Sequence, residues 1–156
     1  MNKKRKELLV SAISNGTVID HIPAENVFQV FKILSLDKTK HQVYFGTNLE
    51  SKKYGTKGII KISDTFFKEE VINKIALVAP TATLIEIRDY EVASKVSISI
   101  PSKIEGIVKC FNPNCVTNME AVKTKFEVLF DETGEIKLAC HYCEKTTSKK
   151  NMTFFM

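Results

Sequence analysis

Short runs of alternating apolar and polar residues, separated by two longer stretches with a helical repeat, fill the first hundred positions. The alternating runs predict strands at 16–22, 41–48, 58–62, 83–87 and 92–100. The two longer stretches, 24–36 and 68–79, carry apolar residues at spacings of three and four, which predicts amphipathic helices.

Turn and cap residues divide these elements. Asn15-Gly16 predicts a turn before the first strand, and Pro23 and Pro80 end the elements that precede them. The run Ser63-Asp64-Thr65 predicts a cap for the second helix, whose first turn carries Glu69 and Glu70. The element order is strand, helix, strand, strand, helix, strand, strand. We therefore predict an α+β fold, a ferredoxin-like antiparallel sheet with two helices.

A second domain is predicted after Ile100-Pro101-Ser102, which places the boundary between residues 1–101 and 102–156. Within the second part, strands at 125–130 and 136–138 flank a glycine-containing turn, so a small all-β domain is expected. About 55 residues are too few for a stable apolar core alone, and a metal cross-link is expected.

Composition is that of a globular protein, with 44% hydrophobic residues among 156. No apolar run approaches the roughly 20 residues that span a bilayer, and no apolar stretch follows the basic start, so a cytoplasmic protein is expected.

The net charge is +5, with the only dense basic cluster at Lys3–Lys6. Basic residues exceed acidic ones by four up to Pro101 and by one after it, so the cysteine-containing half is nearly neutral. Only Arg5 and Arg88 are arginines, so a bound phosphate must be held mostly by lysine point charges. This favours binding of a small anionic ligand over catalysis.

All four cysteines follow the predicted boundary, at Cys110, Cys115, Cys140 and Cys143. Two closely spaced pairs can bring four thiolates to the corners of a tetrahedron, the arrangement of a structural zinc site. His141 lies beside a ligand, but four thiolates already complete the shell. We expect one structural Zn²⁺ for each chain.

Three other interpretations of the cysteines stay open at this stage. Disulfides suit secreted proteins rather than a cytosolic one. A C-x2-C redox pair would leave Cys110 and Cys115 unexplained. A rubredoxin-like iron site or an iron–sulfur site uses the same ligands as zinc.

Several pieces of the sequence then occur in a characteristic order. They are the run Gly16-Thr17-Val18-Ile19-Asp20-His21-Ile22-Pro23-Ala24, Leu77 with Ala79-Pro80, Tyr90-Glu91-Val92, and Cys140-x-Tyr142-Cys143-Glu144-Lys145. With the cysteine spacing and the two-domain order, the chain resembles the regulatory-chain family of aspartate carbamoyltransferase over nearly its whole length.

The resemblance implies a non-catalytic allosteric subunit of pyrimidine biosynthesis that binds nucleoside triphosphates, with CTP or UTP inhibiting and ATP activating. The implied walls of the base pocket are Val10, Ala12, Ile13, Val18, Ile59, Tyr90 and Val92. Asp20 and Lys61 would hold the ribose, Lys95 the phosphates, and His21 and Lys57 further phosphate contacts or a second nucleotide. Ile85 stands where some relatives have an asparagine, and its side chain cannot form hydrogen bonds.

The resemblance also implies docking of the zinc domain onto a separate catalytic chain. Asn112, Asn114, Tyr142 and Glu144 would form part of that interface, and regulatory dimers would bridge catalytic trimers. The alternative function is a zinc-ribbon nucleic-acid-binding protein, suggested by the pI of about 9.0. The sequence shows no P-loop, nucleophile elbow or His-Glu-x-x-His motif, so no catalytic activity is expected. The cysteine-containing half is nearly neutral and lacks a basic stripe, so no nucleic-acid partner is expected, and without a long apolar run no membrane partner is expected.

Overall fold

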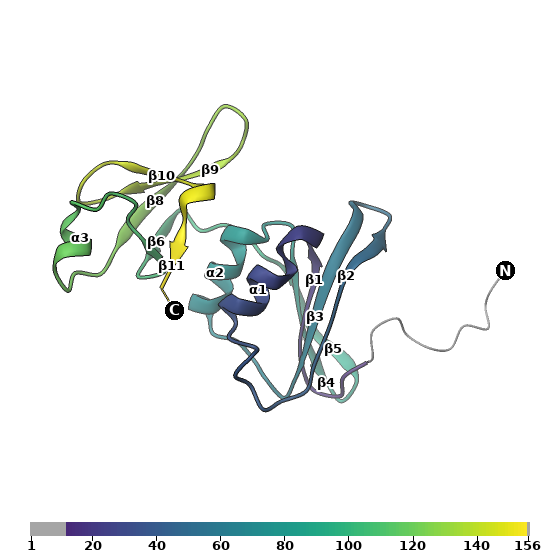
Figure 1. Cartoon of the computed structure of the whole chain (residues 1–156). Coiled ribbons are helices and arrows are strands. Elements are labelled where there is room, and N and C mark those ends of the chain that lie inside the picture. Colours follow the sequence, from purple (N-terminus) through teal and green to yellow (C-terminus); the bar gives the residue numbers. More distant parts are fainter. Residues whose placement is uncertain (1–11, 156) are drawn as a thin grey trace. The chain divides into compact units, whose positions relative to one another are not determined.

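The computed structural model describes residues 12–155 and divides the chain into two compact units, one ending at Ser99 and the other beginning at Ile100 (Figure 1). In the first unit the elements are β1 (Gly16–Ile22), a 3₁₀ turn (Ala24–Asn26), α1 (Val27–Ile33), β2 (Val43–Ser51), β3 (Gly55–Ser63), α2 (Glu69–Val78), β4 (Thr83–Arg88) and β5 (Glu91–Ser97). This order confirms the prediction of an α+β unit with five strands and two helices.

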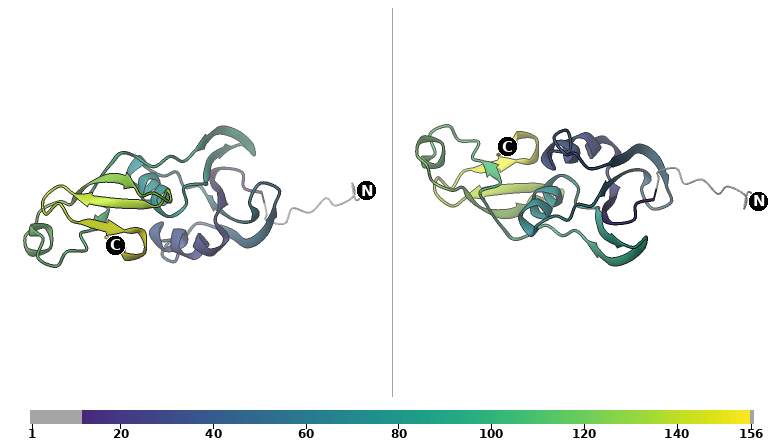
Figure 2. Two further views of the ribbon diagram at one scale, coloured as in Figure 1. Left: turned by 90° about the horizontal axis from the view of Figure 1, so that it is seen from above. Right: turned by 90° about the horizontal axis from the view of Figure 1, so that it is seen from below.

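The five strands form one antiparallel sheet in the order β2-β3-β1-β4-β5. The first four of these positions are the ferredoxin-like arrangement, and β5 adds an edge strand. Helices α1 and α2 contact each other on the same side of this sheet (Figures 1 and 2).

The helix-covered face of the sheet holds the core of the first unit. A Cβ added to Gly58 of β3 would lie 1.9 Å from the Val27 side chain of α1, so Gly58 faces the helices. Ile60 and Ile62, two and four residues further along, share that face and are fully buried. Since side chains alternate along a strand, Ile59 and Lys61 point to the open face, as their alternation predicts.

Several local predictions were wrong. Helix α1 ends at Ile33 rather than at residue 36, and β5 ends at Ser97 rather than at residue 100. The first helix begins at Val27 rather than Ala24, because residues 24–26 form the 3₁₀ turn. The Ser63-Asp64-Thr65 run does not cap α2, whose N-cap is Lys68 without a side-chain hydrogen bond. Ser63 instead ends β3, and the Asp64 amide donates to the Asn15 carbonyl at 2.9 Å. These residues lie in the connection from β3 to α2, and the Asp64 hydrogen bond ties that connection to the segment before β1.

The second unit is a small β domain. Its elements are β6 (Lys103–Glu105), β7 (Val108–Lys109), α3 (Val116–Met119), β8 (Lys125–Phe130), β9 (Ile136–Cys140), β10 (Thr146–Ser148), a 3₁₀ turn (Lys149–Asn151) and β11 (Thr153–Phe154). Strands β10-β9-β8-β6 form one sheet and β11-β7 a second. The β8–β9 hairpin was predicted, and its turn is held by Asp131, whose carboxylate accepts hydrogen bonds from Thr133 and Glu135. The Thr133 hydroxyl is the main cause of the lowered pKa of Asp131.

Within residues 12–155, none of the helices has the length and apolarity to cross a membrane.

Candidate functional site

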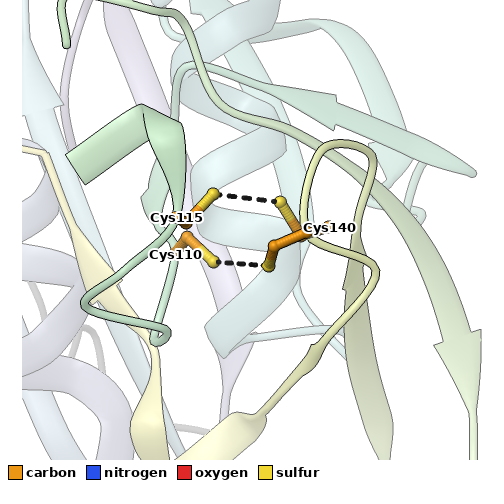
Figure 3. A group of neighbouring side chains, drawn as sticks. Cys110, Cys115 and Cys140 are labelled. Carbon is orange, nitrogen blue, oxygen red and sulfur yellow. Dashed lines mark hydrogen bonds between the residues drawn. The ribbon is translucent and has the colours of Figure 1, made fainter. Parts of the chain in front are cut away.

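The four cysteine sulfurs of the second unit form a cluster in which all lie within 4.8 Å of one another. The shortest described contacts are 3.7 Å between Cys110 Sγ and Cys143 Sγ and 3.7 Å between Cys115 Sγ and Cys140 Sγ (Figure 3). Four sulfurs bound about 2.3 Å from a central zinc ion lie about 3.8 Å apart. The two shortest contacts match the sulfur spacing of a tetrahedral zinc site, and the 4.8 Å limit on the others is compatible with one.

Two tight turns bring these sulfurs together. Cys110 follows β7 and Cys115 precedes α3, so the first pair spans the loop between those elements. Cys140 ends β9, and its backbone N–H donates to the Lys145 carbonyl at 3.0 Å. The Glu144 N–H donates to the Cys140 carbonyl at 3.0 Å, and Glu144 takes a φ of 63° to close this turn.

Burial and hydrogen bonding shift the pKa values of the thiols in different directions. Burial is the main reason that the pKa of Cys110 is raised to about 12, and burial likewise raises the pKa of Cys140. At Cys143, burial raises the pKa, but hydrogen bonds from the Asn112 side chain, the Lys145 backbone and neighbouring sulfurs outweigh it. The result is a pKa of about 7. Cys143 is also the only one of the four that is not buried.

The donor set defines a structural rather than a catalytic metal site. Four thiolates fill a tetrahedral shell and leave no position for a water molecule or a substrate. When bound, the ion supplies a cross-link between the two turns. The disulfide interpretation requires sulfurs about 2.05 Å apart, and all four cysteines are free. The short sulfur contacts join one turn to the other, which also argues against a redox pair of Cys140 with Cys143.

Zinc affinity is expected to rise steeply with pH. Zinc binds thiolates, so each thiol that is protonated without metal releases one proton on binding. A free cysteine thiol has a pKa of about 8.5, and burial raises the pKa further at Cys110 and Cys140, so both are protonated at neutral pH whether or not the metal-free unit is folded. The apparent zinc affinity should therefore increase at least about 100-fold between pH 6 and pH 7. Competition with a chelator of known affinity measures it, and a change below about tenfold would show that these thiols do not release protons.

In the first unit, the predicted ligand-binding residues lie mainly on the open face of the sheet. Val18 of β1 pairs with Lys61 of β3 on one side and Ile85 of β4 on the other. Ile85 in turn pairs with Lys95 of β5. Residues paired across neighbouring strands share a face, so apolar side chains lie between Lys61 and Lys95 in this row, and Tyr44 of β2 pairs with Lys61 beyond it.

Asp20 and Lys57 form an ion pair on the same face. Lys57 Nζ lies 2.8 Å from Asp20 Oδ1, and the backbone N–H of His21 donates to the same oxygen at 2.7 Å. The Asp20 charge also acts on Lys61: burial lowers the pKa of that lysine, and Asp20 partly opposes the change. The structure thus groups one carboxylate with two of the predicted lysines.

His21 lies at the rim of a separate hollow. Its Nδ1 atom is 3.3 Å from Thr83 Oγ1, and its ring meets Tyr54 edge-on with centroids 6.0 Å apart. Its φ of 58° is positive within β1, in the stretch between Ile19 and Ile22 where the register of β1 against β3 shifts. A cavity of about 160 Å³ opens here, lined by His21, Ile22, Pro23, Ala24, Glu25, Tyr54, Thr56 and Thr81. Tyr54 carried no signal in the sequence.

The other predicted pocket residues are dispersed. Tyr90 is 73% exposed and Val92 61% exposed, at the β4–β5 turn. The Tyr90 N–H donates to the Ser14 carbonyl at 2.9 Å, which brings the segment with exposed Ala12 and buried Ile13 beside that turn. Ile59 is half-buried, and Val10 lies outside the described residues.

The predicted docking residues lie on the two turns that carry the cysteines (the cysteine turns), the first from Cys110 to Cys115 and the second from Cys140 to Lys145. Asn112 Oδ1 accepts the Asn114 N–H at 3.1 Å, which braces the first turn. Tyr142 and Glu144 belong to the second turn, with Tyr142 38% exposed and edge-on to His141. Sequence reasoning missed Thr117 and Asn118, which bond to this centre from α3; their only signal was two polar residues directly after a cysteine pair.

The fold and the site define a two-unit metalloprotein: an α+β unit with a lysine-bearing sheet face, and a β unit organised by four thiolates around a structural metal. Comparison with known families agrees. Residues 8–99 match the family described as aspartate carbamoyltransferase regulatory chain, allosteric domain, and residues 102–153 match the metal binding domain of the same chain.

Individual relatives are similar over almost the full length. The chain is 47% identical over 150 residues to the aspartate carbamoyltransferase regulatory chain of Parabacteroides distasonis, with 96% of each chain covered. It is 47% identical to that of Bacteroides thetaiotaomicron, covering 98% of this chain and 99% of the relative. It is 50% identical to that of Pyrococcus horikoshii, covering 94% and 96%. The chain therefore belongs to the aspartate carbamoyltransferase regulatory chains, which are non-catalytic.

Proposed function

We propose that residues 1–101 bind nucleoside triphosphates, and that residues 102–156 dock through their zinc site onto the catalytic chain of aspartate carbamoyltransferase. The observation that carries the nucleotide proposal is the row from Lys61 to Lys95 across the open sheet face, with Asp20 beside it. The enzyme would act in pyrimidine biosynthesis in the cytoplasm, where thiols stay reduced and can hold zinc.

The chemistry of this face suits a nucleotide. Lys61 and Lys95 are three strand spacings apart, roughly 14 Å between their backbones, with Val18 and Ile85 as an apolar floor between them. A triphosphate is an anion that lysines bind as point charges. Asp20 can accept hydrogen bonds from ribose hydroxyls, and Tyr90 and Val92 can cover a base.

Pyrimidine and purine triphosphates would use the same lysines and the same apolar floor on this face. They would therefore compete for it, with CTP or UTP inhibiting the catalytic chain and ATP activating it. Inhibitor and activator must differ in their affinities for two states of the assembly, because equal affinity shifts no equilibrium. A coupling free energy of about 1–3 kcal/mol is typical of such regulation.

The docking surface is built on the metal centre. Asn112 and Asn114 lie on one cysteine turn, and Tyr142 and Glu144 on the other, so zinc binding holds both pairs in place. Regulatory dimers that bridge catalytic trimers would carry one such surface on each chain. Loss of zinc would then remove the docking surface without altering residues 1–101.

The direct test combines assembly and regulation. The zinc-loaded chain is mixed with catalytic trimers, the mass of the complex is measured, and catalytic activity is followed during titration with CTP, UTP and ATP. A complex whose activity falls with pyrimidine and rises with purine nucleotides supports the proposal. A complex insensitive to all three would refute nucleotide regulation, and failure to form any complex would refute docking.

Replacing Lys61 with methionine is expected to weaken triphosphate binding about tenfold or more, because the apolar stem is retained while a partly buried charge is lost. Calorimetry with CTP and ATP measures the change. Lys32→Met on α1 is the matched control, since this exposed lysine lies on an element that covers the other face of the sheet. Equal losses in both variants would indicate a general effect of net charge rather than a site at Lys61.

A further inference from the structure

Asn118 connects the two ends of the first cysteine turn. Its Nδ2 atom donates to the Cys110 carbonyl at 2.8 Å and to the Asn112 carbonyl at 2.7 Å. Both N–H groups of the amide are therefore used on the backbone of the turn. The Asn118 backbone N–H also donates to the Cys115 carbonyl at 2.9 Å, so the residue is anchored to the second cysteine of the pair.

Asn112 extends this connection to the opposite turn. Its carbonyl accepts the Cys115 N–H at 3.1 Å as well as the Asn118 amide. Its side chain accepts the Asn114 N–H at 3.1 Å and hydrogen-bonds to Cys143. The side-chain amide of Asn118 on α3 thus supports Asn112. Asn112 in turn braces the loop and contacts the Cys143 sulfur of the other turn.

Thr117 touches the centre in a different way. Its hydroxyl donates to Cys115 Sγ at 3.2 Å, directly onto a metal ligand. Asn118 reaches only backbone oxygens, so removing its amide leaves the four sulfurs and their hydrogen bonds chemically unchanged. The two neighbours therefore allow an effect on the loop backbone to be separated from an effect on the ligands.

We propose that Asn118 is the positioning residue that couples zinc ligation to the shape of the docking loop, residues 111–114. The inference rests on the proposed function, because it assigns that loop to the contact with the catalytic chain. Without the amide, the Cys110 carbonyl loses the Asn118 donor, the Asn112 carbonyl keeps only the Cys115 N–H, and the loop loses the two side-chain hydrogen bonds that tie it to α3. Zinc then dissociates faster. Even in a zinc-saturated chain, Asn112 and Asn114 are held less firmly in the position that docking requires.

The test compares Asn118→Ala and Asn118→Asp with Thr117→Val in the full chain. Hydrogen-bond partners around metal ligands typically change metal affinity 10- to 100-fold. Zinc transfer to a chelator should be about tenfold faster in both Asn118 variants, since aspartate keeps the shape of asparagine but has no N–H donors. With Co²⁺ in place of zinc, the sulfur-to-metal charge-transfer bands should stay in position for Asn118→Ala and shift for Thr117→Val.

Docking gives the second readout. At saturating zinc, Asn118→Ala should bind catalytic trimers about tenfold more weakly than the unsubstituted chain, while Asn151→Ala, an asparagine of the same unit outside the cysteine turns, should bind normally. Unchanged zinc release, or unchanged docking at saturating zinc, would overturn the coupling. If the unsubstituted chain itself fails to dock, the proposed function and the docking part of the inference both fail. Zinc release and the cobalt spectra would still report whether Asn118 holds the metal site.

Discussion

Substitution of Cys140 with alanine is expected to unfold residues 100–156 and to leave β1–β5 folded. The apolar core of the second unit is small, with Ile104, Ile107, Val108, Phe126, Val128, Ile136 and Leu138 as its buried aliphatic and aromatic side chains among the described residues. A single core in a domain of this size rarely supplies more than about 3–5 kcal/mol. Structural zinc contributes an apparent 10 kcal/mol or more in zinc-finger peptides. The metal is therefore expected to decide whether this unit folds.

Hydrogen exchange measures this outcome by segment. Amides of β8 and β9 should lose protection in Cys140→Ala, and the variant should neither retain zinc nor assemble with catalytic trimers. Amides of β1 and β3 should exchange as in the unsubstituted chain, because these strands belong to the other unit. Saturating chelator should reproduce the result.

Ser148→Ala is the matched control in the same unit. Within the described part of the chain, Ser148 Oγ is a buried oxygen without a hydrogen-bond partner, so its removal should be neutral or slightly stabilising. Retained protection of β8 and β9 in metal-free Cys140→Ala would contradict the structural role assigned to zinc.

The second large effect is expected at Gly16, where alanine should lower the free energy of unfolding of the first unit by about 3 kcal/mol or more. Gly16 has a φ of +138°, and an added Cβ would lie 2.0 Å from the Ile62 carbonyl oxygen. Gly16 pairs with Ser63 and Ile87, so the clash falls between two strands rather than at a free edge. Backbone must move to relieve it.

Gly55→Ala separates the clash from the backbone conformation. Gly55 also has a positive φ, +80°, but nothing lies within 4 Å of an added Cβ. Alanine there should cost about 1–2 kcal/mol, the penalty of the left-handed conformation alone. Denaturant titration, followed by exchange protection of β1 and β3, compares the variants. Equal costs at Gly16 and Gly55 would show that contact with Ile62 contributes nothing.

Much of the fold followed from local patterns. The alternation of Ile59, Ile60, Lys61 and Ile62 predicted which side chains of β3 are buried, because the two-residue period of a strand is independent of its partners. The Ser63-Asp64-Thr65 cap was predicted wrongly, because the conformation of this segment depends on a partner elsewhere in the chain. The Asp64 N–H donates to the carbonyl of Asn15, a residue far away in the chain, and α2 begins further along, with Lys68 as its N-cap.

By itself, the sequence determined the metal centre and the order of elements. Spacings of four and two residues between cysteines bring each pair of thiols together within a single turn, and thiolate chemistry selects a metal such as zinc. The tertiary structure decided which polar residues meet. Val18 lies between Lys61 and Ile85, Asp20 contacts Lys57, and Asn118 reaches Cys110 and Asn112. The strand contacts depend on register between segments distant in sequence, where a slip of one residue would turn every side chain to the other face.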